Sequence, residues 1–252
     1  MDRIEHPIEA QKIGIDVHLA KEILLETRIC DLPATIEDTG YEIFTKKLRC
    51  ELDDQNLFHV QPIFYLGDEW FCPENSACIA IPFWLADSRL RDLELEKIGF
   101  VEGAKGREFM KLLRHECGHC VDHLFGLSKK IEWQNIFGSP KQAYQPEQYS
   151  WQKKSKDYVQ HLPEGYAQSH PEEDFAETFA VWLDPQSRWR TKYKDWHGAL
   201  RKLEFVDFTM KELINVKPKK LPNIKMCDQR RMRKTLRKYY SDRIRSNVIT
   251  IN

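Results

Sequence analysis

The stretch Leu112–His123, LLRHECGHCVDH, contains the residues on which the interpretation of the chain depends. Within it, His115, Glu116 and His119 match the pattern H-E-x-x-H. Residues four apart lie on the same face of a helix, so the two histidines could bind one metal ion. Glu116 could then face a water molecule on that ion. The rest of the chain must show whether a zinc site is completed around these residues.

A third ligand is required, because a catalytic zinc ion usually has three protein ligands. His123 is eight residues from His115, about 12 Å along the helix axis, which is too far for both to bind one zinc ion. The segment HPEEDFAETFA, beginning at His170, offers Glu173 and Glu177 on one face of a predicted helix. We expect Glu173 to be the ligand and Glu177 to orient a ligand histidine. The alternative is that these acidic residues only favour the start of a helix.

The cysteines and the N-terminus indicate the cellular compartment in which we expect the protein to be found. Seven scattered cysteines argue against a disulfide framework and for a reducing, cytoplasmic location. Cys117 and Cys120 form a C-x-x-C pair, but the chain has no second such pair at the spacing of a zinc ribbon. We therefore interpret the two cysteines as small buried side chains. The charged N-terminus lacks the apolar core of a signal peptide. No apolar run approaches the ~20 residues of a membrane span, so we expect no membrane association.

Hydrophobic periodicity predicts an α+β fold in the first half of the chain. Helices are expected over 8–29, about 41–52, 87–103 and 106–125, the last closed by Gly126. Short strands are expected over 57–67, 68–71 and 76–85. The core candidates of the first helix are Ile15, Leu19 and Ile23, with Leu24 beside them.

Pro82 lies inside the last predicted strand and indicates that this strand is at the edge of the sheet, because proline cannot donate to a central ladder. An edge strand could pair with an extended peptide by adding it to the sheet. The expected substrate-binding residues are therefore Cys78, Ile79, Ala80 and Ile81.

The second half of the chain is predicted to be mainly helical. The irregular stretch 127–168 is too long and too rich in aromatic residues to serve only as a connecting loop. We therefore expect it to form a packed loop or the wall of a cleft. Ser169 and Glu172 form a predicted capping box, with Pro171 in the first turn of the next helix. Further basic helices are expected over about 188–215 and 226–244.

The charge of the chain is balanced overall but not along its length. Formal net charge is zero, yet residues 211–245 contain 13 Lys and Arg against three acidic residues. One interpretation is a nucleic-acid tether formed by the basic segment 217–245, which deletion of 217–252 would remove. The other, which the sequence favours, is a basic face of one lobe that complements the acidic other lobe, or simply a solvated helix.

The motifs together resemble a known superfamily. HECGHCVDH, followed by Tyr166 and by Glu173-Asp-Phe-Ala-Glu177, resembles the gluzincins, and in particular the lethal-factor-type subgroup. More broadly, four blocks resemble a bacterial family of zinc-binding metallopeptidases and cover most of residues 14–240. They are DEWFCPENSACIAIPFWLA, LRHECGHCVDH, YAQSHPEEDFAETFAVWL and LRKLEFVD.

This resemblance implies a fold and a domain organisation. The expected fold is a zincin-like metalloprotease fold, α+β, in which a small mixed sheet with an edge strand packs on the H-E-x-x-H helix. A mainly helical C-terminal lobe would follow. The chain would form one domain over 1–252, with an α/β lobe over about 1–126 and a helical lobe over about 127–252.

The resemblance also implies roles for individual residues. His115, His119 and Glu173 would bind one Zn²⁺ per chain, and Glu116 would be the general base for a zinc-activated water that hydrolyses a peptide bond. Tyr166, seven residues before Glu173, would donate to the oxyanion. His161 and His170 lie close by in sequence and remain alternatives for that role, and Tyr166 could instead be a packing residue. The expected partner is a peptide or protein substrate; a non-catalytic zinc-binding or peptide-binding module is the alternative function.

Overall fold

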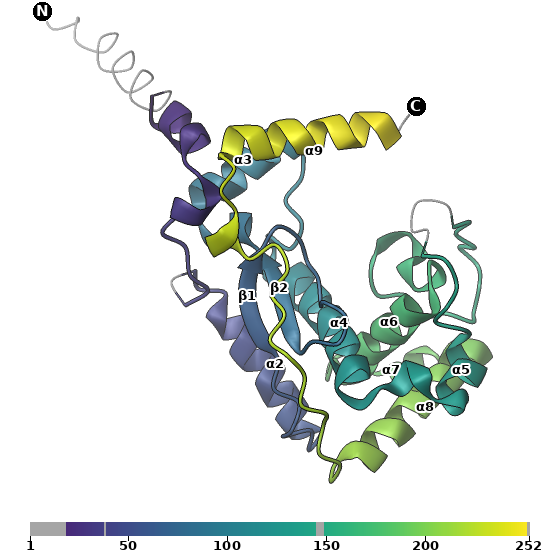
Figure 1. Ribbon diagram of the computed structural model, residues 1–252. Helices are drawn as coiled ribbons and strands as arrows, with labels where there is room; N and C mark the ends of the chain where they lie inside the picture. Colours follow the sequence, from purple (N-terminus) through teal and green to yellow (C-terminus); the bar gives the residue numbers. More distant parts are fainter. Residues whose placement is uncertain (1–18, 38, 145–148, 251–252) are drawn as a thin grey trace, which may run out of the picture.

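The computed structural model describes residues 19–37, 39–144 and 149–250, without the side chains of 247–250. Helices dominate and enclose one small sheet, so the α+β prediction is confirmed (Figure 1). The first described helix covers residues 19–26. The others are α2 (Glu42–Asp54), α3 (Ser88–Ile98), α4 (Gly106–Phe125), α5 (Ile131–Phe137), α6 (Pro171–Leu183), α7 (Trp189–Lys192), α8 (His197–Leu213) and α9 (Leu236–Thr250).

The sheet is smaller than predicted and is not mixed. It consists of β1 (Ile63–Gly67) and β2 (Cys78–Pro82), which run parallel with Tyr65 beside Ala80. Residues 68–71 form no strand, and Phe71 makes only an isolated antiparallel bridge to Ala80. After Pro82 the chain turns into a short 3₁₀ helix, because proline cannot extend the ladder.

The expected substrate-binding edge of β2 is closed. Cys78, Ile79, Ala80 and Ile81 are each at most 2% exposed. The Ala80 N–H donates to the Phe71 carbonyl at 2.8 Å, and the Cys78 N–H donates to the Ser76 hydroxyl at 3.1 Å. Because these donors are used within the chain, the structure corrects our expectation that these four residues bind an extended substrate.

Helix α4 lies at the centre of the molecule and has the predicted bounds, from Gly106 to Phe125. Gly126 ends it in the left-handed region, at φ 61°, as a glycine after a helix commonly does. Arg114 anchors α4 to α2 by donating from two nitrogens to the Glu51 carboxylate, each at 2.7 Å. A buried ion pair with this two-point geometry fixes the orientation of one helix relative to the other.

Helix α6 packs directly against α4. A Cβ on Gly118 would lie 2.8 Å from the Cα of Ala176, so only glycine allows this approach. The predicted capping box is wrong: His170 is the N-cap and accepts from the Glu172 N–H at 3.2 Å. Ser169 instead donates to the Tyr166 carbonyl at 2.7 Å. Pro171 occupies the first turn of the helix, as predicted.

The N-terminal helix buries a different face from the predicted one. Leu19 and Ile23 are 56% and 62% exposed, whereas Leu25 is buried and Leu24 is partly buried. Ile29, in the short 3₁₀ helix Ile29–Asp31 that follows, is also buried. Ile15 lies outside the described residues. The four-residue spacing therefore predicted a helix correctly but assigned the wrong face of this helix to the core.

The described parts of the irregular stretch 127–168 contain α5 and side chains that pack into the core. Trp133 is fully buried and Val159 is 1% exposed. The main apolar core is continuous across both predicted lobes, from Leu25 to Tyr240. None of the helices in the described ranges is sufficiently long and apolar to span a bilayer.

The basic C-terminal segment does not form a separate tail. After α8 it returns along the sheet and ends in α9, beside the N-terminal helices (Figure 1). Tyr65 donates to the Met226 carbonyl, Arg28 forms a bridge with Thr235, and the Gln229 side chain donates to the Ile29 carbonyl. The segment predicted to belong to the C-terminal lobe therefore packs against the N-terminal half.

Candidate metal centre

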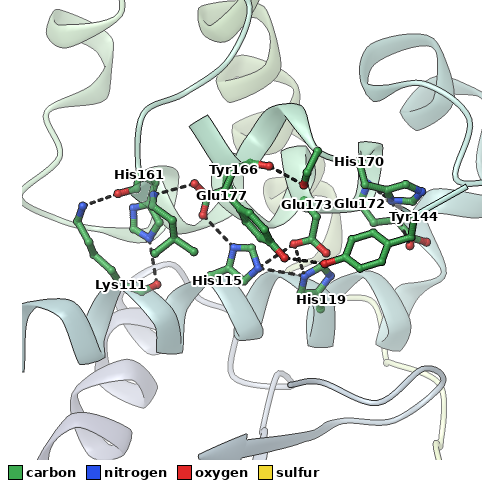
Figure 2. A network of polar contacts seen from close by, with 12 residues as sticks. Lys111, His115, His119, Tyr144, His161, Tyr166, His170, Glu172, Glu173 and Glu177 are labelled. Atoms are coloured by element: carbon green, nitrogen blue, oxygen red, sulfur yellow. Dashed lines mark hydrogen bonds and ion pairs between the residues drawn. The ribbon is translucent and has the colours of Figure 1, made fainter. Parts of the chain in front are cut away.

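Three side chains from α4 and α6 meet at one point (Figure 2). The Glu173 Oε2 atom lies 3.0 Å from His115 Nε2 and 3.2 Å from His119 Nε2. The two histidine nitrogens are 3.2 Å apart. Within the described ranges these residues form the one group of three or more side chains with metal-ligating atoms at this spacing.

The geometry fits a single zinc ion. Tetrahedral zinc with bonds of about 2.0–2.1 Å holds its ligand atoms about 3.3 Å apart. The observed separations of 3.0–3.2 Å are close to this value. Two imidazole nitrogens and one carboxylate oxygen are also ligands that zinc prefers, and three ligands leave one position open. The side chains of His115, His119 and Glu173 therefore fit the ligand requirements of one zinc ion.

Glu177 holds His115 in place. Its Oε1 atom accepts from His115 Nδ1 at 2.9 Å, and its Oε2 atom accepts from the Leu162 N–H at 2.8 Å. With Nδ1 as the donor, the lone pair of Nε2 is directed towards Glu173 and His119. A carboxylate that orients a ligand histidine in this way is a common feature of zinc sites. The sequence prediction named Glu177 but not the backbone of Leu162.

The charges of the ligand residues are strongly linked. Burial lowers the pKa of His115, but the carboxylates of Glu173 and Glu177 raise it well above its usual range. Burial also opposes the ionised form of Glu173, but the two histidines hold its pKa below the usual range. The carboxylates of Glu173 and Glu177 thus balance positive charge at the two histidines, whether that charge is a proton on an imidazole or a bound cation.

Glu116 lies beside this group and is 6% exposed. Burial raises its pKa, while the two ligand histidines lower it. Its carboxylate makes no hydrogen bond to the described part of the chain. A buried carboxylate without a structural partner is available for proton transfer.

Tyr166 is carried by the 3₁₀ segment Pro163–Gln168 and reaches the same site (Figure 2). Its ring centroid lies 5.7 Å from that of His115. Its hydroxyl is 2.7 Å from the Tyr144 hydroxyl. Burial raises the pKa of Tyr166, so the phenol remains neutral and can donate a hydrogen bond.

The two alternative histidines are engaged elsewhere. His161 Nε2 bonds to the Lys111 carbonyl at 3.0 Å. His170 uses Nδ1 to cap α6 and Nε2 to bond to the Gln142 carbonyl at 3.1 Å. Of the three candidates, Tyr166 is the one whose hydroxyl lies beside the ligand histidines, in contact with Tyr144 rather than with a backbone carbonyl.

Tyr144 is the residue of the site that sequence reasoning missed. It contacts Tyr166 and packs edge-on against His170, with ring centroids 5.7 Å apart. It lies in the irregular stretch 127–168, where no periodic pattern or motif marks a functional residue. The prediction of a cleft wall in this stretch was the only signal that could have pointed to it.

The remaining polar residues of the opening motif lie outside the metal group. Cys117 and Cys120 are fully buried, in agreement with their predicted packing role. His123 Nδ1 lies 3.3 Å from the Ser76 carbonyl and 3.6 Å from the Cys72 sulfur. Asp122 accepts from the Ser128 N–H at 2.7 Å and so stabilises the end of α4.

An α+β chain whose H-E-x-x-H helix and a later helix bring two histidines and a glutamate together has the ligand set of a mononuclear zinc protein. Comparison with protein families agrees with this class. The chain belongs to the family described as "Putative zinc-binding metallo-peptidase", whose model matches residues 80–226, more than half of the sequence. That range includes α4, Tyr166 and α6. No curated protein and no solved structure matched the chain.

Proposed function

We propose that the protein is a zinc-dependent peptidase of the gluzincin type, with His115, His119 and Glu173 as the ligands of one Zn²⁺. Membership of the metallopeptidase family supports the reaction class. The observation that carries the proposal is the convergence of three ligand atoms within 3.0–3.2 Å of one another. When bound, zinc would polarise the scissile carbonyl and increase the acidity of a water molecule.

Glu116 is the general base of the proposed mechanism. It accepts a proton from the attacking water and later delivers that proton to the amine that leaves. Its burial and its lack of a structural partner support this role, because both make proton exchange easier. Glu177 does not exchange protons with the substrate, since its two oxygens hold His115 and the Leu162 N–H.

Tyr166 is the proposed oxyanion donor. Its neutral phenol donates a hydrogen bond to the carbonyl oxygen as negative charge develops on it. Tyr144 positions this phenol through the contact between the two hydroxyls. For Tyr166 to donate to substrate and keep this hydrogen bond, Tyr144 must be the donor and Tyr166 the acceptor in the contact between the two hydroxyls.

The proposed substrate is a peptide or protein. Because the outer edge of β2 is closed, an extended substrate would not add to the sheet at that edge. A competing function is a zinc-bound module that holds a peptide without cleaving it. The two functions differ in Glu116, which is the general base of the peptidase and has no catalytic role in the non-catalytic module.

Substitution Glu116→Gln is the test of the proposed function. The variant is expected to retain one zinc per chain and to lose cleavage by about 10²–10⁴-fold, the usual contribution of a general base. Cleavage would be measured with a library of denatured proteins and peptides, and zinc by metal analysis of the same samples. Glu108→Gln, on the same helix, is the matched control and should cleave like wild type.

Two outcomes would contradict the proposal. Glu116→Gln that cleaves at the wild-type rate would remove the assigned base. Wild-type protein with full zinc that cleaves no member of the library would favour the non-catalytic module.

A further inference from the structure

A cavity of about 660 Å³ lies beside the N-terminal half of α4 and includes none of the proposed metal ligands. Its lining comes from α2, from the start of α4, from residues 160–161 and from 181–192. Five basic residues contribute to this lining: Lys47, Arg107, Lys111, Arg114 and Lys192. Asp184 is its one acidic residue.

The positive charge of this basic cavity is largely uncompensated. Arg114 is paired with Glu51 at 2.7 Å and with Asp184 at 3.2 Å. Across residues 19–37, 39–144 and 149–250, the other four cations make no ion pair with an acidic side chain. Among the described residues, four basic side chains of the cavity therefore lack an acidic partner, although Lys111 donates to a backbone carbonyl and Lys192 lies over the Tyr193 ring.

Lys111 shows that these charges act on one another. It is half-buried, and its ammonium donates to the His161 carbonyl. Burial lowers its pKa, Glu177 opposes this effect, and the positive charges of Arg107 and Lys192 lower the pKa further. Like charges held this close together destabilise each other unless an anion lies between them.

We propose that the basic cavity binds a small phosphate-bearing molecule. Arginine and lysine donors, and the free N–H groups at the start of α4, are suited to phosphate oxygens. The volume is within the usual range for small-molecule sites. Ser187 is one of the lining residues, and its hydroxyl oxygen is buried and has no hydrogen-bond partner in the described part of the chain.

A small molecule fits this site better than a nucleic acid does. The cations converge on a concave site, whereas a polymer backbone is usually followed by an extended basic groove. None of the lining residues comes from the basic C-terminal segment 217–252. Phe44, Met110 and Val181 also line the cavity and could contact the carbon part of the ligand.

The basic cavity and the metal centre can be tested separately. Lys111 and His161 lie on the far side of Glu177 from Tyr144 (Figure 2). A phosphate bound at the proposed metal site would be lost with the metal, whereas a phosphate in the basic cavity would remain. The proposal therefore does not depend on the proposed peptidase function.

The test is calorimetric titration of the full chain with inorganic phosphate and with glucose 1,6-bisphosphate at constant ionic strength. Lys47→Gln combined with Lys192→Gln should weaken bisphosphate binding by about 10–100-fold, because each lost cation removes a charge-assisted hydrogen bond. The matched control combines Lys46→Gln with Lys194→Gln, which removes the same charge from neighbouring positions that do not line the cavity. The control should bind like wild type.

His119→Ala completes the experiment, and it should bind the bisphosphate with unchanged affinity. Absence of binding to wild type would overturn the proposal, as would equal weakening in the control pair. Loss of binding in His119→Ala would reassign the phosphate to the metal centre. Binding of a short DNA or RNA duplex with the same dependence on Lys47 and Lys192, without binding of the bisphosphate, would replace the small molecule by a nucleic acid.

Discussion

At the scale of single residues, Tyr166 and Tyr144 have different expected contributions. Tyr166→Phe removes the proposed oxyanion donor and should lower kcat by about 10²–10³-fold, the usual effect of losing one such donor. Tyr144→Phe removes only the partner of Tyr166 and should have a smaller effect on kcat. Both variants should bind zinc like wild type, because neither hydroxyl is a ligand.

Steady-state cleavage by the two single variants and by the double variant measures this difference. Because the hydroxyls are 2.7 Å apart, the two effects should not add. If Tyr166→Phe cleaves as fast as wild type, another donor stabilises the oxyanion.

The cluster of proposed ligands could be identified from the sequence because its chemistry is tied to spacing. His115 and His119 are four apart, as are Glu173 and Glu177, and each pair is brought to one face by the geometry of the helix. Tyr144 could not be predicted in this way, since no regular element links its position in the sequence to the site. The Leu162 N–H is a backbone group, so side-chain patterns contain no information about it.

At the scale of elements, the contact between α4 and α6 determines whether the site can assemble. Gly118→Ala would place a Cβ 2.8 Å from the Ala176 Cα and would force the helices apart. We expect a loss of about 1–3 kcal/mol in stability from this overpacking, together with weaker zinc binding as Glu173 moves from the histidines.

Thermal unfolding and zinc titration measure the two effects of Gly118→Ala. Cys117→Ala is the control, since it changes the adjacent buried position by removing volume instead of adding it. It should lower stability while zinc affinity stays close to that of wild type. Unchanged zinc affinity in Gly118→Ala would show that the close approach of the helices is not required for the site.

Elements with strong periodicity and clear ends were predicted most accurately. Helix α4 has the expected bounds because its apolar pattern is long and Gly126 ends it. The strands were overpredicted, since short apolar runs between turns do not reveal whether a pairing partner exists. The capping of α6 by His170 was missed because histidine is not among the preferred capping residues.

At the scale of the whole molecule, the C-terminal segment is part of the core. Tyr239 and Tyr240 are buried, and several basic residues are paired with acidic ones: Arg237 with Glu22 and Glu26, and Arg243 with Glu94. The sequence could not predict this return, because nothing in its local pattern records which distant surface a segment covers. These pairs support the interpretation of a basic face that complements an acidic one.

Deletion of 217–252 should therefore destabilise the fold as well as remove charge. The truncated chain is expected to unfold at a clearly lower temperature, because it loses the buried tyrosines and the contacts of Gln229 with Ile29. The control is a full-length variant with Lys217, Lys220 and Lys225 replaced by glutamine, which should melt like wild type. A truncated chain that keeps the wild-type melting temperature would contradict the assignment of this segment to the core.

The nucleic-acid tether remains a hypothesis that the same full-length variant can address. Salt-dependent DNA or RNA binding that is lost on removal of the three lysines would support it. Equally weak binding by wild type and variant would leave the segment with a structural role only.

The most direct test of the central claim is metal analysis of wild-type protein and of His119→Ala, both purified without added zinc. The account predicts one zinc per wild-type chain and none in the variant, with both proteins folded. Wild-type protein without zinc, or zinc retained in full by His119→Ala, would contradict the assignment of His115, His119 and Glu173 as its ligands.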